Sequence, residues 1–428
     1  MGQTNSSIAC KFLFHFLEKA PFFLCNKNRT ARESKPTLSD RIFYAWEIGQ
    51  DLGHVARFAP IVWELRKHHV HFSYALTDLS RCYFLQRSVN DCIYQAPCCT
   101  ALRGQVRENL SYPQTLINHG FLETDVLASR MVAWMRLFAI EHPKVVICDF
   151  APVAQIVAQS MGIPTVMLGT SFECPPAESP MPPFTSVERH LQPAIFEDQI
   201  LVDHCMAESS RRVGLTPTTL AKMIKDSKKV FLCTYPELGC YGPHRNVSYY
   251  GTWNISSGKQ ASFTSLHDDK IFCYLKFRPG VEYLVGSLHG LDADTLIFID
   301  GASKEFIDWF SSPNVRFLDS PADIATLASD LSLAVTNGNH GTTSLLLSLG
   351  TPVLMMPLHI EQTVHAKRAE MSGLGVTIDQ SRICDFAKVV KGMLADSSLK
   401  QRTMDFSSKS EKYRDSVSKI ANEILTCL

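Results

Sequence analysis

The sequence lacks the features that mark three common classes of protein. Its 14 cysteines include no C-x-x-C pair, so neither a thioredoxin-type redox motif nor a zinc site is indicated. The 42 basic and 42 acidic residues cancel, so the charge gives no reason to expect nucleic acid as a partner. Cysteines scattered in this way fit a reducing compartment, and we expect a cytoplasmic protein.

The first 39 residues also lack a clear pattern. The apolar stretch from Ile8 to Cys25 is interrupted by four ionisable side chains, which is too polar for a membrane span of ~20 apolar residues. It is compatible with an amphipathic surface helix or with a disordered tail. The opening Met1 to Ser6 fits the N-myristoylation pattern, so peripheral membrane contact through this extension is an alternative to a purely cytoplasmic protein.

The rest of the chain alternates strands and helices. With 428 residues, 45% hydrophobic and 20% charged, it is long enough for two globular domains. We expect an extension over 1–39, a Rossmann-like domain over 40–251, a polar linker over 252–269 and a second Rossmann-like domain over 270–428. The fold class is therefore α/β with parallel sheets. Helices over 383–394 and 410–425 are expected to complete the second domain.

The most informative stretch is a strand–turn–helix–strand unit between Leu331 and Val376. It contains an apolar strand (Leu333 to Val335), a turn rich in Asn and Gly (337–341), a helix opening at Thr342 and a strand from Val353 to Pro357. Glycines allow a ligand to approach the backbone, and the N-terminus of the following helix favours an anion. The unit predicts a phosphate-bearing ligand, although such turns also carry glycine for steric reasons alone.

Glu361 and Gln362 follow the second strand of this unit. A carboxylate and an amide can together accept from and donate to the vicinal hydroxyls of a sugar, and open α/β sheets bind ligands at the carboxyl ends of their strands. The alternative is an ordinary helix start with an acidic first turn.

A first βα unit places His54 at the mouth of a helix, after a strand from Ile42 to Ile48. A second strand, Val145 to Asp149, ends in a carboxylate. By pattern alone His54 is a cap or a packed side chain more often than a catalytic group, and Asp149 is commonly a helix cap. A loop from Gly169 to Phe172 and a Pro-rich segment suit an apolar ligand or a simple connection.

These motifs together resemble the UDP-glycosyltransferase family. The matching residues are Asn337-Gly338-Asn339-His340-Gly341-Thr342, Gly350-Thr351-Pro352, Pro357, Glu361-Gln362 and, near the N-terminus, Gly53-His54. The matched order of elements runs from Arg41 onward and resembles the GT-B architecture, in which two Rossmann-like domains face a central cleft. In relatives the last helix returns to the first domain.

The chain departs from the family pattern at two positions in the turn. Asn337 stands where relatives have a phosphate-contacting His, and Asn339 where they usually have Gly. An Asn can still donate a hydrogen bond to a phosphate oxygen, but it cannot carry a positive charge.

The resemblance implies an inverting glycosyltransferase that moves a hexose from a nucleotide sugar, with UDP as the expected nucleotide, to a hydroxyl of a small hydrophobic or lipid-like acceptor. No cofactor and no metal are implied, and the nucleotide sugar is a substrate. His54 would be the general base and Asp149 would orient it, since a neutral imidazole can accept a proton. The implied donor-binding residues are Asn337, Gly338, Asn339, His340, Gly341, Thr342, Glu361, Gln362 and Leu318, and the acceptor-binding residues are Gly53, Thr170 and Phe172.

Two alternatives stay open at this point. Asn337 and Asn339 are compatible with a weakened sugar-nucleotide-binding protein, although a pure binder has no use for a base such as His54. An epimerase or hydrolase on the same fold is the other alternative, because fold alone does not decide the reaction.

Overall fold

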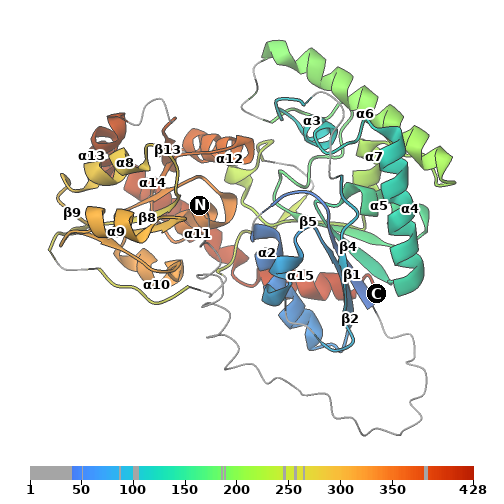
Figure 1. The fold of residues 1–428 in the computed structure, drawn as a ribbon, viewed down its shortest axis with the longest axis horizontal. Coiled ribbons are helices and arrows are strands. Elements are labelled where there is room, and N and C mark those ends of the chain that lie inside the picture. The colour runs from blue at the N-terminus through green and yellow to red at the C-terminus, as the bar shows by residue number, and fades with distance from the viewer. Residues whose placement is uncertain are drawn as a thin grey trace, which may run out of the picture. The chain divides into compact units, whose positions relative to one another are not determined.

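The computed structural model describes residues 41–50, 52–85, 88–99, 106–184, 187, 189–243, 247–254, 258–263, 266–379 and 384–428. Asp40–Leu428 form one compact unit (Figure 1). The expected extension over 1–39 lies outside the described residues, so its myristoylation and membrane contact stay predictions. Among the residues that are described, every helix is too short or too polar to cross a membrane.

The first sheet is parallel and has seven strands in the described chain. Their spatial order is β3 (Cys92–Gln95), β2 (His71–Leu76), β1 (Arg41–Trp46), β4 (Val145–Asp149), β5 (Thr165–Gly169), β6 (Lys229–Leu232) and β7 (Ser248–Tyr249). The middle strands are buried along their whole length, as expected for a parallel sheet covered on both faces.

The second sheet is also parallel and has six strands within the described ranges. Their order is β10 (Val315–Phe317), β9 (Ala293–Asp300), β8 (Asp269–Lys276), β11 (Leu333–Thr336), β12 (Val353–Met355) and β13 (Gly375–Thr377). The two-sheet α/β class that the sequence predicts is therefore confirmed. The domain boundaries stay a prediction: β7 ends before 252–269, and β8 begins at Asp269, the last residue of that range.

Both sheets share one topology. In each sheet the first strand lies in the middle, and the next two strands are added towards one edge. The fourth strand lies on the other side of the first, and the remaining strands follow it towards the other edge. This is the Rossmann order. The order reverses between β1 and β4 in the first sheet and between β8 and β11 in the second. Ligands bind at such switch points, outside the carboxyl ends of the strands.

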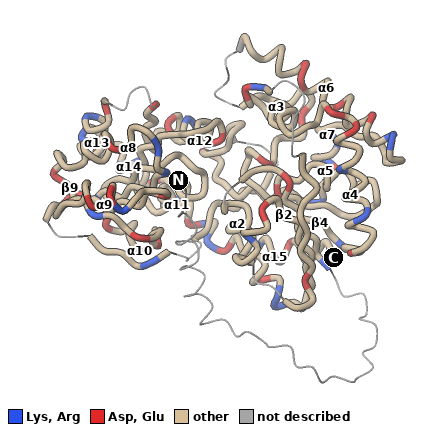
Figure 2. The backbone as a smooth tube through the Cα atoms, viewed as in Figure 1, with Lys and Arg blue, Asp and Glu red and all other residues tan. Residues whose placement is uncertain are grey.

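Helices occupy the connections between the strands. The first sheet is accompanied by α2 (Gly53–Arg66), α3 (Tyr112–Ile117), α4 (Thr124–Glu141), α5 (Pro152–Ser160), α6 (Gln192–Arg212), α7 (Leu220–Lys225) and the 3-10 turn η3 (Pro236–Leu238). From β8 onward the chain contains α8 (Val281–Leu288), α9 (Lys304–Phe310), α10 (Ile324–Leu327), α11 (His340–Ser348), α12 (Ile360–Met371), α13 (Phe386–Ala395), α14 (Ser397–Ser410), η6 (Glu411–Tyr413) and α15 (Ser416–Leu425). Figure 2 shows acidic and basic residues interspersed along these elements.

The prediction of a final helix over 410–425 is correct at its end and wrong at its start. Ser410 ends α14, and the final helix, α15, begins only at Ser416. The polar composition of α14 concealed it, because only two of its four buried residues, Leu399 and Phe406, are apolar.

The final helix packs against the helix that carries His54. Ile420 and Ile424 of α15 share an apolar cluster with Phe58, Ile61 and Leu65 of α2. Tyr250, just after β7, donates from its hydroxyl to Glu423 Oε1 over 2.9 Å. Residues 416–425 therefore support the first sheet, although they follow the second in the chain.

We expect Ile424→Ala to lower the free energy of unfolding by about 2–5 kcal/mol, because it leaves a cavity between α15 and α2. The measurement is chemical denaturation monitored by circular dichroism. Ile200→Ala is the control, since Ile200 on α6 is 68% exposed and its loss should change the free energy of unfolding by less than about 0.5 kcal/mol. Equal effects of the two substitutions would show that α15 is not a structural part of the first sheet.

Candidate active site

The pairing of β1 with β4 brings together the two side chains proposed for catalysis. Trp46 pairs with Asp149 at the carboxyl end of the two strands, and α2 begins a short loop later. His54 lies in the first turn of this helix and is 8% exposed. Its Nδ1 is 2.7 Å from Asp149 Oδ1.

Neither residue serves as a helix cap. The N-cap position of α2 is Leu52, without a side-chain hydrogen bond. The N-terminus of α5, which follows β4, is capped by Glu47, whose carboxylate accepts from Val153 N (3.0 Å) and Ala154 N (2.9 Å). Asp149 is thus directed at His54 instead of the helix that follows its strand.

Three donors converge on the Asp149 carboxylate, which is completely buried. Besides His54, Tyr44 donates from its hydroxyl to Oδ2 (2.8 Å) and Arg57 donates from Nη2 to Oδ1 (2.7 Å). A carboxylate only accepts, so Nδ1 of His54 carries the proton and Nε2 is left with a free lone pair. This is the tautomer that a general base requires.

The imidazole is fixed from two further sides. The Trp46 indole stacks on it, with ring centroids 4.9 Å apart and planes at 23°. Gly49 has φ +102°, and a Cβ there would lie 2.4 Å from His54 Nε2. Only a glycine leaves the proton-accepting nitrogen uncovered on this side.

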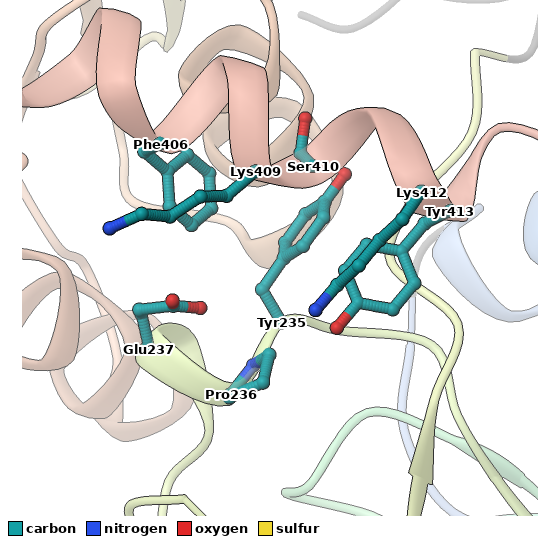
Figure 3. Close-up of a pocket in the computed structure, with 8 residues that line it drawn as sticks. All are labelled: Tyr235, Pro236, Glu237, Phe406, Lys409, Ser410, Lys412 and Tyr413. Atoms are coloured by element: carbon teal, nitrogen blue, oxygen red, sulfur yellow. The ribbon is translucent and has the colours of Figure 1, made fainter.

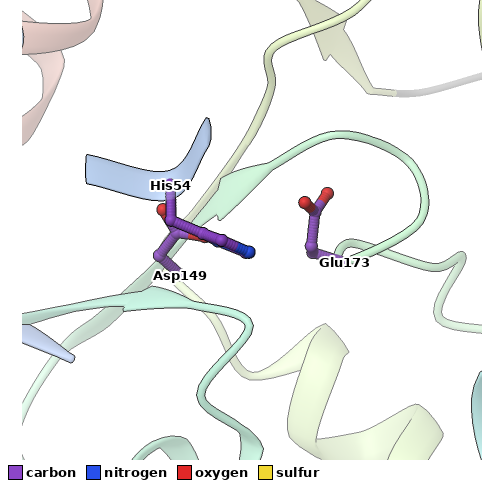
Figure 4. A group of neighbouring side chains, drawn as sticks. All are labelled: His54, Asp149 and Glu173. Carbon is purple, nitrogen blue, oxygen red and sulfur yellow. The ribbon is translucent and has the colours of Figure 1, made fainter. Parts of the chain in front are cut away.

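A second buried carboxylate completes the cluster, as Figure 4 shows with His54 between Asp149 and Glu173. Glu173 lies in a tight turn after β5, where its Oε2 accepts from the backbone N (2.5 Å) and the hydroxyl of Thr170. Its Oε1 is 3.5 Å from Arg57 Nη1. Burial alone would raise the Glu173 pKa, but Arg57, His54 and the Thr170 hydrogen bond hold it below its usual range.

The surroundings raise the His54 pKa above its ordinary 6.5. Burial lowers it, and so does the neighbouring guanidinium of Arg57. The charge and hydrogen bond of Asp149, with a further contribution from Glu173, outweigh both. The imidazole is therefore a stronger base than a free histidine.

The same three side chains have the composition of a metal site. Ligand atoms of His54, Asp149 and Glu173 lie within 4.8 Å of one another. The Arg57 guanidinium, however, already bonds both carboxylates. A divalent ion would have to displace or repel this cation, so the residues do not fit a metal.

On the second sheet, Asn337 follows β11 at the switch point. Its Oδ1 accepts from Lys276 N at the end of β8 (2.8 Å), and its Nδ2 donates to Met356 O after β12 (3.0 Å). Asn337 therefore joins three strand ends, and one N–H of its amide is left to reach a ligand.

The turn after Asn337 prepares an open helix N-terminus. Gly338 has φ +77°, and a Cβ there would lie 3.2 Å from Gln362 O. Asn339, at the N-cap of α11, makes no capping bond with its side chain, and its buried Oδ1 has no hydrogen-bond partner among the described residues. Gly341 and Thr342 lie in the first turn of α11. The arrangement can accept an anion at the helix N-terminus.

The His340 side chain bonds a segment that follows β6 of the first sheet, and it carries no charge that could attract an anion to this turn. Its Nε2 is 2.8 Å from Thr234 Oγ1, just after β6. Its ring is also 4.7 Å from that of His365 on α12. Burial, and secondarily His365, hold the His340 pKa well below 6.5, so the ring is neutral.

Glu361 and Gln362 open α12. The Gln362 Oε1 accepts from Leu358 N (2.8 Å), which closes the first turn. The Glu361 carboxylate is half-exposed and lies 3.9 Å from His365 Nε2. Because Gly338 approaches the backbone of Gln362, the structure brings the Asn337–Thr342 turn and this helix start together.

The remaining predicted residues lie in three other places. Leu318 follows β10 and packs in an apolar cluster with Leu296 and Leu327, so its contact with a nucleobase stays a prediction. Gly53 is the exposed first residue of α2. Thr170 and Phe172 are both buried, the former bonded to Glu173 and the latter stacked on Phe184 with centroids 4.9 Å apart.

A surface pocket, drawn in Figure 3, contains none of these residues. It lies where α14 and η6 meet the segment after β6, and Tyr235 there packs edge-on against Phe406 and Tyr413. We interpret it as a gap in the packing between these elements and not as a ligand site. It is lined by Tyr235, Pro236, Glu237, Phe406, Lys409, Ser410, Lys412 and Tyr413.

Sequence reasoning missed Tyr44, Gly49, Arg57 and Glu173. Arg57 had a usable indication, because it lies three residues after His54 and so on the same helix face. Glu173 stands as a single charge between Phe172 and Cys174, and a carboxylate in such an apolar run is an indication of a paired, buried charge. No feature of the sequence indicated the role of Gly49, because that role is evident only from its φ and from its distance to His54.

No protein-family model matches the chain. Among curated proteins, the zeaxanthin glucosyltransferase of Pseudescherichia vulneris is 22% identical over 309 residues, which are 65% of this chain and 72% of that protein. The sterol 3-beta-glucosyltransferase of Vanderwaltozyma polyspora is 28% identical over 100 residues, or 23% of this chain, and the match covers 8% of that longer protein.

Solved structures share the fold over nearly the whole chain. The glycotransferase of kitacinnamycin covers 91% of this chain and 99% of its own, with a TM-score of 0.67 and 14% identity. The calicheamicin glycosyltransferase CalG4 covers 91% and 98%, with a TM-score of 0.64 and 14% identity. Spinosyn rhamnosyltransferase SpnG complexed with thymidine diphosphate covers 90% and 99%, with a TM-score of 0.60 and 13% identity. The fold is GT-B, and the resemblance to the UDP-glycosyltransferase family is confirmed.

We expect Gly49→Ala to lower the free energy of unfolding by roughly 1–3 kcal/mol, because its φ is strained for alanine and the new methyl group overlaps the His54 ring. Gly53→Ala is the matched control. Gly53 has open space around its Cβ position and begins a helix, so alanine there should be neutral or stabilising by up to about 1 kcal/mol. Thermal and chemical unfolding measure both variants, and similar stability of the two would contradict the placement of Gly49 against Nε2.

Proposed function

We propose that the protein is an inverting glycosyltransferase that transfers a hexose from a UDP-sugar to a hydroxyl of a small hydrophobic acceptor. The observation that carries the proposal is the oriented pair of His54 and Asp149 at the switch point of one sheet. The second sheet presents an uncapped helix N-terminus at its own switch point. One site suits a base and the other a diphosphate, as a nucleotide-sugar transferase requires.

On the acceptor side, the attacking hydroxyl would donate its proton to Nε2 of His54. The acceptor oxygen would bond to the anomeric carbon of the sugar as the bond from that carbon to the diphosphate oxygen breaks. The nucleoside diphosphate leaves, and displacement from the opposite face inverts the anomeric configuration. Asp149 holds the ring in the productive tautomer and stabilises the imidazolium that forms.

On the donor side, the diphosphate would bind at the N-terminus of α11, where negative charge grows as the leaving group departs. Backbone N–H groups and the helix dipole can hold that charge without a metal ion. The amide of Asn337 has one N–H to contribute. Arg278, after β8, has a buried Nη1 without a partner among the described residues and is a further candidate for the diphosphate.

An apolar acceptor is supported by the aromatic side chains next to Glu173. Phe172 packs edge-on against Phe150 and stacks on Phe184, which in turn contacts Tyr241. Aromatic side chains of this kind are suited to contact apolar ligands with few polar atoms. The zeaxanthin and sterol relatives bear names of hydrophobic alcohols, which is in line with this acceptor class.

Incubation with nucleotide sugars and a panel of hydrophobic alcohols separates this proposal from its alternatives. Transfer to an alcohol supports the glycosyltransferase. Nucleotide binding without transfer would favour a binding protein, and nucleotide release without acceptor would favour a hydrolase. Calorimetry with UDP and thymidine diphosphate decides the nucleobase, because SpnG and VinC were solved with thymidine diphosphates.

We expect His54→Ala to reduce kcat by roughly 10²–10⁴-fold, because it removes the base, while the affinity for the nucleotide changes little. Initial rates of transfer and calorimetric titration of UDP measure the two quantities. His68→Ala, an exposed histidine just past the other end of the same helix, is the control and should retain wild-type rates. Equal loss of transfer and nucleotide affinity would remove His54 from this role.

We expect kcat/KM to fall as the pH decreases through a midpoint above 6.5. His54 must be neutral to accept a proton, and its pKa in the folded protein is raised. A raised pKa also means that the protonated ring stabilises the fold at low pH and that this contribution is lost as the pH rises through the raised value. Asp149→Asn removes the charge that raises the pKa most, so its midpoint should lie at lower pH. If Asp149→Asn leaves the acid-side midpoint of the kcat/KM profile unchanged, Asp149 does not set the pKa of the catalytic base.

A further inference from the structure

The His54–Asp149 pair differs from a simple base and its carboxylate in one respect. Arg57, one turn along α2 from His54, donates from Nη2 to the same Oδ1 of Asp149 that His54 contacts, each over 2.7 Å. Nη2 also comes within 3.4 Å of His54 Nδ1. Because both of these nitrogens carry protons, this is an approach of two donors that works against a protonated ring.

The positive charge of Arg57 therefore neutralises much of the negative charge by which Asp149 would stabilise the imidazolium. A buried guanidinium and one buried carboxylate have no net charge, so a proton placed on His54 would leave the cluster with an uncompensated positive charge. The fold supplies a second carboxylate at this place. Glu173 is 5% exposed, and its Oε1 is 3.5 Å from Arg57 Nη1.

The turn that carries Glu173 is built to hold the carboxylate in place. Thr170 donates to its Oε2 from both backbone and hydroxyl. Gly169 leaves room for it, since a Cβ there would lie 2.9 Å from the Glu173 Cβ. These contacts fix the carboxylate beside Arg57, and Figure 4 shows Glu173 next to His54 and Asp149.

We propose that Glu173 is a positioning residue whose charge compensates Arg57, so that Asp149 can stabilise protonated His54. This inference rests on the proposed function for its catalytic meaning. Two carboxylates and one guanidinium give the cluster one negative charge before proton transfer and none after it. Proton transfer thus ends in a neutral cluster, which is the state that a buried site favours.

Other ionisable groups near the cluster are neutral and do not upset this balance. Tyr44 donates to Asp149, and burial, with the charge of Asp149, raises the Tyr44 pKa far above its ordinary 10. Burial also raises the pKa of the thiols of Cys174 and Cys233. His340 and His365, which face Glu173 from α11 and α12, have pKa values lowered first by burial.

The test removes the charges of Glu173 and Arg57 singly and together, and it measures the titration of His54 in each variant. Wild type, Glu173→Gln, Arg57→Met and the double variant are labelled with ¹³C-histidine, and the His54 ring signal, assigned through His54→Ala, is titrated against pH. Glu173→Gln should move the midpoint to lower pH and Arg57→Met to higher pH. The double variant, which restores the net charge, should return it towards wild type. Glu173→Asp keeps the charge and should retain most of the wild-type midpoint.

The pH profile of kcat/KM should follow the same order, and Glu173→Gln should also lower its plateau about 3- to 30-fold. Glu178→Gln, five residues further on and exposed, is the matched control and should leave the His54 titration unchanged. If a single variant does not fold, the double variant and Glu173→Asp still test the balance. The inference is overturned if Glu173→Gln leaves the midpoint in place, or if the double variant does not restore it. The titration needs no substrate, so it stays informative even if no transferase activity is found.

Discussion

The candidate site depends on the register between β1 and β4. Their parallel pairing sets Trp46 opposite Asp149, so that the loop to α2 and the end of β4 leave the sheet at one point. A shift of the pairing by one residue would turn Asp149 to the other face of the sheet. His54 would then lose its partner even if every other element were unchanged. The contact between a histidine and a carboxylate 95 positions apart is thus a property of the sheet.

Much of the fold could be predicted because strands and helices leave local patterns. β4 has the bounds that the sequence predicts, and the two switch points follow from strand order once the sheets are known to be parallel. The roles of Arg57 and Glu173 could not be predicted in this way. They depend on distances between three separate elements, and a single sequence contains no information on which buried charges compensate one another.

At the second switch point, the contacts of Asn337 give a structural reason for its departure from the family pattern. By sequence, Asn337 reads as a weakened phosphate ligand. In the structure its amide bonds the backbone at the ends of β8 and β12, so it fixes the shape of the turn at this switch point. An anion bound at this place would be held by the backbone N–H groups of α11, because Asn337 itself carries no charge.

The packing of α15 on α2 has a consequence for how the protein is made. The helix that carries His54 is synthesised before the second sheet, yet residues 416–425, which are synthesised after that sheet, cover part of its apolar face. During synthesis this face stays exposed until the second sheet has also been translated. The first sheet can form early, but its completed core must wait, and a nascent chain with such a surface is a natural client for chaperones.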